Sequence, residues 1–437
     1  MLIKRIQIGL IHAAVAITLV PINSTLNRIL IEDLGIAATL VVLLFSPPYL
    51  FSFIQVAIGS FSDRHPILGF RRTPSIIAGL ILCVIGLMLA AQVAVLLPQN
   101  FWLGLGLGVL TFGAWGMGFN LATVSYFSLA SEISGEGGRS KTTATMFFIM
   151  IVSIIITAAS LSRMLVDYSP ERLQSAFTIV ALAALFLGLV GLIRLEKRNI
   201  HYAADRRYSL GSAWHEIRSN RQVLTFFVYL VLMLAAILGQ DVLLEPFAAR
   251  AFGLPVEATT RITSIWGGVF LVSLVATGFL ENRVPKLTIA RLASILGMIA
   301  FGLVAMSGFV GSQTLFYLGV ILLGMATGPA TVSNLSLMLD MTIPGKVGLF
   351  IGAWGSANAF ARLLGSLVTA AVRDLVDMLP NSALFGYASA FIVLGAFLGI
   401  SLLMLRRVDV QTFKTDSTNQ RSADDFIERV ALVNDGG

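Results

Sequence analysis

The chain has 437 residues, of which 57% are hydrophobic and 12% charged, and its mean hydropathy is +0.87. About a quarter of the residues of an ordinary soluble domain are charged, so this composition excludes soluble globular and disordered proteins. The net charge of +7 does not indicate a nucleic-acid partner, because the basic residues gather in short loops between apolar runs. The single cysteine, Cys83, lies in such a run, which excludes a disulfide framework and a cysteine-based metal site. The sequence therefore predicts a polytopic membrane protein.

Twelve apolar segments are long enough to cross a membrane as helices. A helix needs about 20 apolar residues to span a hydrocarbon core about 30 Å thick. The runs lack the two-residue alternation that is typical of a membrane β-barrel. The predicted spans cover residues 6–31, 36–61, 73–97, 101–129, 142–166, 173–195, 223–246, 259–281, 286–309, 313–340, 346–372 and 383–405.

The charges of the loops predict the orientation of these spans. Most of the 30 lysines and arginines fall on one side of the membrane if both termini lie on that side. Because basic loops stay in the cytoplasm, both termini are predicted to be cytoplasmic. The predicted organisation is an N-terminal six-helix bundle (1–195), a cytoplasmic linker with an interfacial helix (196–222), a C-terminal six-helix bundle (223–405) and a cytoplasmic tail (406–437).

The two halves share polar residues at matching span ends. Ala122-Thr-Val-Ser125 recurs as Ala330-Thr-Val-Ser333, and Glu132 matches Asp340 at the same spacing. Chance similarity between apolar segments explains shared leucines, but it explains shared polar residues at equivalent span ends poorly. The sequence therefore predicts an internal duplication.

The loop between the second and third predicted spans carries Gly59, Asp63, Arg64, Arg71 and Arg72. Its pattern resembles the signature loop of the major facilitator superfamily. A glycine lets two helix ends approach closely, and a carboxylate near a helix N-terminus can pair with arginine. These residues are predicted to form a cytoplasmic latch between the halves, the alternative being a solvated basic turn that only fixes the topology. The resemblance implies an all-α membrane protein of that superfamily fold, with twelve transmembrane helices in two pseudo-symmetric six-helix bundles.

Three further segments narrow the resemblance. They are Asn23-Ser-Thr-Leu-Asn-Arg28, Gln240-Asp241-Val-Leu-Leu-Glu245-Pro246 and the run from Gly352 to Arg362. Together they resemble the PucC/LhaA group, the bacteriochlorophyll-delivery branch of the superfamily, over about residues 6–405. The resemblance implies a role in assembling light-harvesting or photosystem complexes, with bacteriochlorophyll or chlorophyll as bound cargo.

The same resemblance implies partners and a location. The expected partners are light-harvesting or reaction-centre subunits, pigment-synthesis enzymes and membrane lipids, in a bacterial inner, intracytoplasmic or thylakoid membrane. The sequence contains no Walker lysine, zinc-ligand spacing or nucleophile elbow, so neither an enzyme nor a metal site is predicted. Two alternatives stay open: a proton-coupled secondary transporter of an amphipathic or tetrapyrrole-like solute, and a membrane scaffold for antenna subunits that does not transport.

Charged residues within the spans are candidates for function, because each costs at least ~2.5–3.5 kcal/mol on insertion scales unless it is paired or hydrated. Arg28 and Asp241 lie at a similar depth in the equivalent first and seventh spans. We therefore predict that Arg28 pairs with Asp241 or Glu245, the alternative being a local pair with Glu32 four residues on. Arg362 is predicted to face the cavity or to pair with Asp241.

The predicted ligand-binding or gating residues are Asn23, Asn27, Arg28, Gln240, Asp241, Glu245 and Arg362. Amides dominate the polar residues of the cavity, which suits a large apolar ligand or a protein partner better than a sugar or an amino acid. Asp241 is the deep carboxylate best placed to carry a proton. His12 is the one histidine within a span, and a packed side chain is a better interpretation of it than a magnesium ligand for a pigment.

Overall fold

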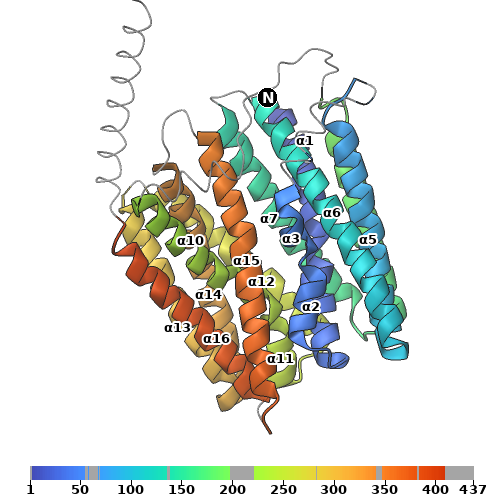
Figure 1. The fold of residues 1–437 in the computed structure, drawn as a ribbon, viewed down its shortest axis with the longest axis vertical. Coiled ribbons are helices and arrows are strands. Elements are labelled where there is room, and N and C mark those ends of the chain that lie inside the picture. Colours follow the sequence, from blue (N-terminus) through green and yellow to red (C-terminus); the bar gives the residue numbers. More distant parts are fainter. Residues whose placement is uncertain are drawn as a thin grey trace, which may run out of the picture.

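The computed structural model describes residues 2–54, 58, 67, 69–134, 138–196, 221–281, 283–340, 347–380 and 383–408. Most of the predicted linker, nearly all of the predicted tail and the latch residues Gly59, Asp63 and Arg64 lie outside these ranges. Figure 1 shows the helices of the first half, in blue to green, standing beside those of the second half, in yellow-green to red. The N-terminus lies at one end of this bundle, and the opposite end, lowest in Figure 1, is called the distal end below.

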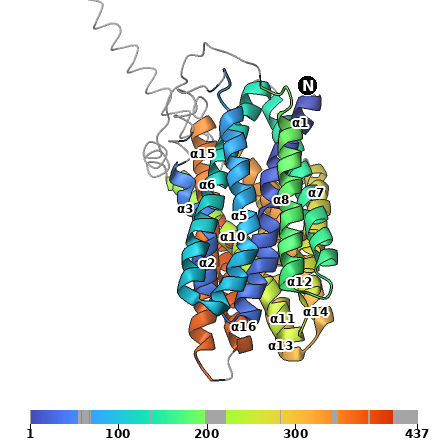
Figure 2. The ribbon, with the colours of Figure 1, turned by 90° about the vertical axis from the view of Figure 1, so that its right-hand side faces the viewer.

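The described residues of the first half form ten helical segments. They are α1 (Leu2–Ile17), the π-helical η1 (Pro21–Leu26) and η2 (Ile29–Asp33), α2 (Ala38–Phe45), α3 (Pro47–Leu50), the 3-10 helix η3 (Phe51–Ile54), α5 (Thr73–Gln99), α6 (Phe101–Ser134), α7 (Arg139–Met164) and α8 (Pro170–Leu192). Figure 2 shows α5, α6 and α8 side by side on the outer side of this half.

The described residues of the second half form eight segments. They are α10 (Arg221–Gly239), the 3-10 helix η5 (Gln240–Val242), α11 (Leu244–Phe252), α12 (Val256–Leu280), α13 (Lys286–Val310), α14 (Gln313–Asp340), α15 (Val347–Asp377) and α16 (Ala383–Leu405). Gly253 ends α11 in the left-handed conformation with a φ of +63°, which glycine adopts without strain.

Ten helices of the described chain are long and apolar enough to cross a membrane. The two other predicted spans are also present as helical structure. The eleventh is α15, whose 31 residues extend over about 46 Å at 1.5 Å per residue. The second is interrupted, because Pro47 and Pro48 lack the amide hydrogens that would continue α2 and instead begin α3. The prediction of an all-α protein with twelve spans is confirmed, whereas the boundaries of its four parts stay predictions.

The first and seventh spans both lose α-helical geometry towards the distal end. The first changes from α1 into the π-helical turns η1 and η2, and the seventh changes from α10 into η5 and α11. Pro21 begins η1, and its missing amide hydrogen cannot continue the bonding pattern of α1. Such departures leave backbone groups to be satisfied by other segments, as the pocket described below shows.

Helix pairs in one half recur in the other. In the first half, α1 packs against α7 and α8, and α5 packs against α6 and α8. In the second half, α10 packs in the same way against α15 and α16, and α13 packs against α14 and α16. The halves meet at two places: α7 contacts α12, and α2 and α3 contact α15. These two contacts are equivalent, because the pseudo-two-fold rotation that relates the halves exchanges α7 with α15 and the second span with α12. Two ion pairs repeat as well: Arg72 binds Glu132 at 3.1 Å, and Lys286 binds Asp340 at 2.8 Å. The structure therefore has the pseudo-symmetry that the repeat predicts.

The helices α10 and α15 approach each other closely at two glycines. A Cβ atom on Gly239 would lie 2.8 Å from the carbonyl carbon of Gly365, and a Cβ atom on Gly365 would overlap the backbone of Ala235. Two helix backbones can touch in this way only where side chains are absent.

We predict that Gly365→Ala destabilises the protein by about 1–3 kcal/mol, because its methyl group would push α15 away from α10. Gly355→Ala, in the same helix, is the matched control, since no described neighbour lies within 4 Å of the added Cβ atom. We expect the control to be neutral or stabilising by ~0.5–1 kcal/mol, because alanine favours helix. Thermal unfolding in detergent measures both variants, and equal losses would contradict the close approach.

Candidate functional site

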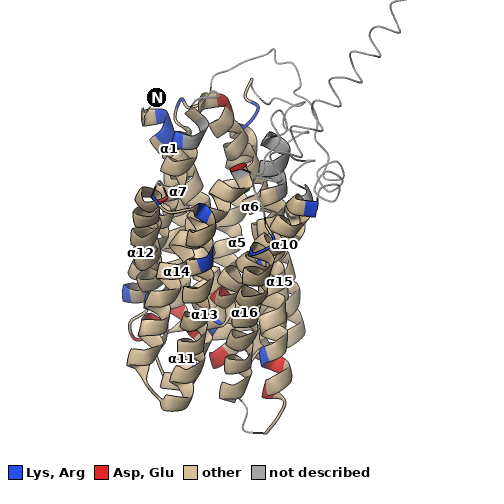
Figure 3. Ribbon diagram, turned by 90° about the vertical axis from the view of Figure 1, so that its left-hand side faces the viewer, with Lys and Arg blue, Asp and Glu red and all other residues tan. Residues whose placement is uncertain are grey.

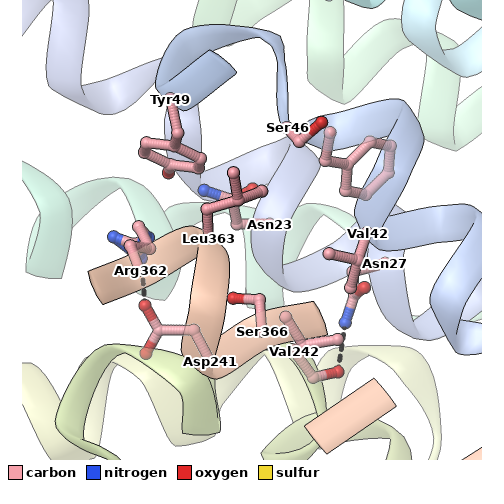
Figure 4. A pocket seen from close by; sticks show the side chains of 11 residues that line it. Asn23, Asn27, Val42, Ser46, Tyr49, Asp241, Val242, Arg362, Leu363 and Ser366 are labelled. Atoms are coloured by element: carbon pink, nitrogen blue, oxygen red, sulfur yellow. Dashed lines mark hydrogen bonds and ion pairs between the residues drawn. The ribbon is translucent and has the colours of Figure 1, made fainter. Parts of the chain in front are cut away.

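A pocket lies between the two halves, close to the breaks in the first and seventh spans. It holds about 390 Å³ of open space, including solvent at its mouth. Figure 4 shows the side chains that surround it. They are Asn23, Asn27, Val42, Phe45, Ser46, Tyr49, Asp241, Val242, Arg362, Leu363 and Ser366.

An ion pair forms one wall of this pocket. The guanidinium of Arg362 donates to the carboxylate of Asp241, and the two side chains are 20% and 25% exposed. Gln240 Nε2 donates to the second carboxylate oxygen of Asp241 at 2.6 Å. Arg362 also lies over the ring of Tyr49, with 5.3 Å between its guanidinium carbon and the ring centre. The two charges of the pocket therefore neutralise each other, and Arg362 connects the second half to the first.

An amide closes the pocket on the opposite side. Asn27 Nδ2 donates to the backbone oxygen of Val242 at 2.6 Å, as the dashed line in Figure 4 marks. Val242 is the last residue of η5, where the seventh span leaves the regular bonding of α10. The side chain of the first half thus satisfies a carbonyl that the break in the second half exposes.

Arg28 does not pair with Asp241 or Glu245, so that prediction is wrong. Its guanidinium binds Asp33 and donates to the backbone oxygen of Leu254 at 3.4 Å. The physical reason is the π-helical geometry of the segments around it, in which hydrogen bonds join residues five apart. In this geometry Asp33, five positions after Arg28, lies next to the Arg28 side chain, where Glu32 would lie in an α-helix.

The local alternative, a pair between Arg28 and Glu32, is also wrong, because Glu32 points to the second half. The alternative in which Arg362 pairs with Asp241 is confirmed. Of the predicted site residues, the pocket brings together Asn23, Asn27, Asp241 and Arg362. Arg28 and Glu245 lie outside its lining, and Gln240 contributes through Asp241.

The distal end holds a cluster of charges that the sequence analysis did not predict. The carboxylate of Glu32, whose side chain is 6% exposed, binds Arg250 at 2.9 Å and Arg373 at 3.6 Å. It also accepts a hydrogen bond from the hydroxyl of Tyr387. Basic and acidic segments lie together at this end of the bundle in Figure 3. Every one of these partners of Glu32 belongs to the second half, so the cluster joins the halves.

Asp374 makes a second connection across the distal end. Its carboxylate accepts from the backbone amides of Ala38 and Thr39 at 3.1 and 2.8 Å, and from the Thr39 hydroxyl at 2.7 Å. The residue before α2, Ala37, has no side chain able to cap the helix. A carboxylate of the second half therefore caps a helix of the first half, where the helix dipole favours negative charge. We call Glu32, Arg250, Arg373, Asp374 and Tyr387 the distal cluster.

Arg71 and Arg72 are the described members of the predicted latch. Arg72 binds Glu132, and the carboxylate of Glu196 accepts from the backbone amides of Arg71, Arg72 and Thr73 at 2.7–3.0 Å. These contacts order the start of α5 within the first half. Whether the latch also joins the two halves stays a prediction.

His12 is packed among aromatic rings rather than placed in the pocket. Its ring centre lies 5.2 Å from Tyr126, 5.5 Å from Phe127 and 5.2 Å from Phe147, and the residue is 6% exposed. Within the described residues, no three histidine, cysteine, aspartate or glutamate side chains gather as the ligands of a metal ion would.

The comparison with protein families identifies the chain. The family model described as PUCC protein matches residues 25–413. The chain belongs to the PucC family. Among its relatives, "Protein PucC" of Cereibacter sphaeroides is 26% identical over 417 residues, with 92% of this chain and 91% of that protein covered. "Bacteriochlorophyll synthase 44.5 kDa chain" of Rhodobacter capsulatus is 28% identical over 394 residues, with 87% and 90% covered.

Solved structures of transporters share the fold of this PucC-family protein. The nucleoside transporter NupG superposes with a TM-score of 0.74 at 15% identity, over 93% of this chain and 99% of the other. A bacterial homologue of the lysosomal transporter Spinster superposes with a TM-score of 0.71 at 12% identity, over 94% and 97%. At these identities the likeness shows the major facilitator fold alone.

The ion pair in the pocket leads to a double-mutant test. We expect Asp241→Asn and Arg362→Gln each to lower the yield of folded protein, because each leaves a largely buried charge without its partner. The double variant should recover part of the loss, with a coupling of about 0.5–3 kcal/mol measured by thermal unfolding. Arg28→Gln combined with Asp241→Asn is the control and should show additive losses. Additive losses for Asp241 and Arg362 would contradict the pairing.

Proposed function

We propose that this protein is an assembly factor for light-harvesting or photosystem complexes that binds or delivers bacteriochlorophyll or chlorophyll in a photosynthetic membrane. The observation that carries the proposal is the match of residues 25–413 to the PucC family. The relative named as a bacteriochlorophyll synthase chain links the family to this pigment class.

The chemistry of the pocket supports an amphipathic ligand. Val42, Phe45, Val242 and Leu363 give it an apolar surface beside its polar groups, as sites for amphipathic ligands have. Its strongest polar groups already have protein partners, because Asp241 binds Arg362 and Asn27 binds a backbone oxygen. A sugar or amino acid needs several convergent hydrogen-bond partners, whereas Asn27, Ser46, Asp241 and Arg362 of this lining already bind other protein groups.

The proposal includes partners, location and the absence of catalysis. The partners are light-harvesting or reaction-centre subunits and pigment-synthesis enzymes, which would meet the protein through its surfaces in the membrane. The location is a bacterial inner, intracytoplasmic or thylakoid membrane, with both termini in the cytoplasm as the basic loops predict. We propose no catalytic step for any residue of the pocket.

An absorption spectrum of the purified protein tests the proposal. The full chain, isolated from membranes of a photosynthetic host in a mild detergent, should carry bacteriochlorophyll or chlorophyll and co-purify with antenna or reaction-centre subunits. Val42→Trp should lower the bound pigment, because it fills the pocket. Leu43→Trp is the matched control on the same helix, because Leu43 is 49% exposed and is not part of the pocket lining.

Two other results would contradict the proposal in different ways. Pigment-free protein that still co-purifies with antenna subunits would favour a scaffold. Pigment-free protein that accumulates an amphipathic solute in vesicles, driven by a pH gradient, would favour a transporter.

A further inference from the structure

Glu245 is a buried carboxyl group with hydroxyl partners, and it forms no ion pair within the described residues. The residue is 3% exposed. Its Oε1 atom accepts hydrogen bonds from Ser24 Oγ and Thr263 Oγ1, each at 2.5 Å. Its Oε2 atom is enclosed and has no hydrogen-bond partner within the described part of the chain. Neither Arg28 nor Arg362 forms an ion pair with Glu245, because Arg28 binds Asp33 and Arg362 binds Asp241.

The described charges around Glu245 have other partners, and Arg28, the arginine whose positive charge acts on it, is itself bound to Asp33. The segments packed around Glu245 carry charged and titratable residues from both halves. In the first half these are Arg28, Glu32 and Asp33 of the first span. In the second half they are Asp241 on η5, Arg250 on α11, Glu257 and Arg261 on α12, and Tyr387 on α16. Arg28 pairs with Asp33, Arg250 and Arg373 pair with Glu32, and Asp241 pairs with Arg362. Arg261 is exposed. An ionised Glu245 would be a buried charge without a partner, which is far less favourable than the neutral acid.

The contacts of Glu245 also join the two halves. Ser24 lies in η1 of the first half, whereas Thr263 lies in α12 of the second. The neighbouring bond between Thr25 and Thr260, at 3.1 Å, crosses the same boundary. A movement that separates the halves at the distal end must therefore break the bond from Ser24 and let water reach the carboxyl group.

We propose that Glu245 is a proton-binding site whose occupancy is linked to the contact between the two halves. It holds a proton while the distal end is closed and releases it to water when the halves separate. By linkage, proton binding favours the closed arrangement, and a rise in pH favours separation. The role that the sequence suggested for Asp241 passes to Glu245, because Asp241 has Arg362 as its counter-ion. The proposal stands whether or not the protein binds pigment.

Distance measurements between the halves test the linkage. Gln99, the last residue of α5, and Gln313, the first of α14, are exposed at the distal end. Spin labels on Gln99→Cys and Gln313→Cys, in a Cys83→Ala background of the full chain, report their separation by pulsed electron paramagnetic resonance. We expect longer distances to gain population as the pH rises from acidic to alkaline.

Glu245→Gln should hold the short distance at every pH, because glutamine imitates the protonated acid. Glu257→Gln is the matched control on the neighbouring helix α12 and should keep the pH response. A Glu245→Gln protein with the pH response of the unsubstituted chain would overturn the proposal, and so would an unsubstituted chain without a response.

Infrared spectroscopy gives a second reading that does not need Glu245→Gln to fold. The unsubstituted protein should show the carbonyl stretching band of a protonated carboxyl group near neutral pH. Ser24→Ala and Thr263→Val should each shift this band, because each removes one hydrogen-bond partner of Oε1. The absence of such a band, or a band that neither variant moves, would overturn the proposal.

Discussion

The distal cluster is the interaction on which the arrangement of the two halves depends. Glu32 comes from the first half, and its partners Arg250, Arg373 and Tyr387 come from three different helices of the second. In a weakly polar environment, burying Glu32, Arg250 or Arg373 alone would be energetically unfavourable, and the ion pairs between them offset this cost. Asp374 adds a directional contact, because it caps α2 of the first half. The pocket lies between halves that this cluster keeps in register.

The breaks in the first and seventh spans connect the distal cluster with the pocket. The π-helical turns direct Asn27 to the carbonyl of Val242 and place Arg28 against Asp33. The break after α10 directs Asp241 to Arg362 in the pocket and leaves Glu245 one turn further on, beside Ser24. Irregular helix geometry is tolerated within a membrane only where protein groups satisfy the backbone. Here it places polar residues of both halves in one narrow region.

The sequence predicted the fold well, because apolar runs, loop charges and repeated polar residues are local features. It also placed Asp241 and Arg362 together as one of two alternatives. It failed for Arg28, since a spacing of four assumes an α-helix and the chain is π-helical there. It missed the role of Glu32 because its partners Arg250 and Arg373 lie more than 200 positions away in the sequence. Charged residues at the ends of membrane helices are common, so their positions alone do not indicate a contact between the halves. Gly59, Asp63 and Arg64 lie outside the described residues.

The most direct test of whether the distal cluster holds the halves together is chemical labelling of a cysteine buried where the two halves meet. Thr260, fully buried, would be replaced by cysteine in a Cys83→Ala background. With Glu32→Gln and Asp374→Asn added, we predict that a membrane-impermeant maleimide labels it at least about tenfold faster, because breaking a buried ion pair costs more than the ~1.4 kcal/mol equivalent to that factor. Arg172→Gln, which removes an exposed ion pair with Asp167, should leave the rate unchanged. An unchanged rate in the Glu32 and Asp374 variant would contradict the account.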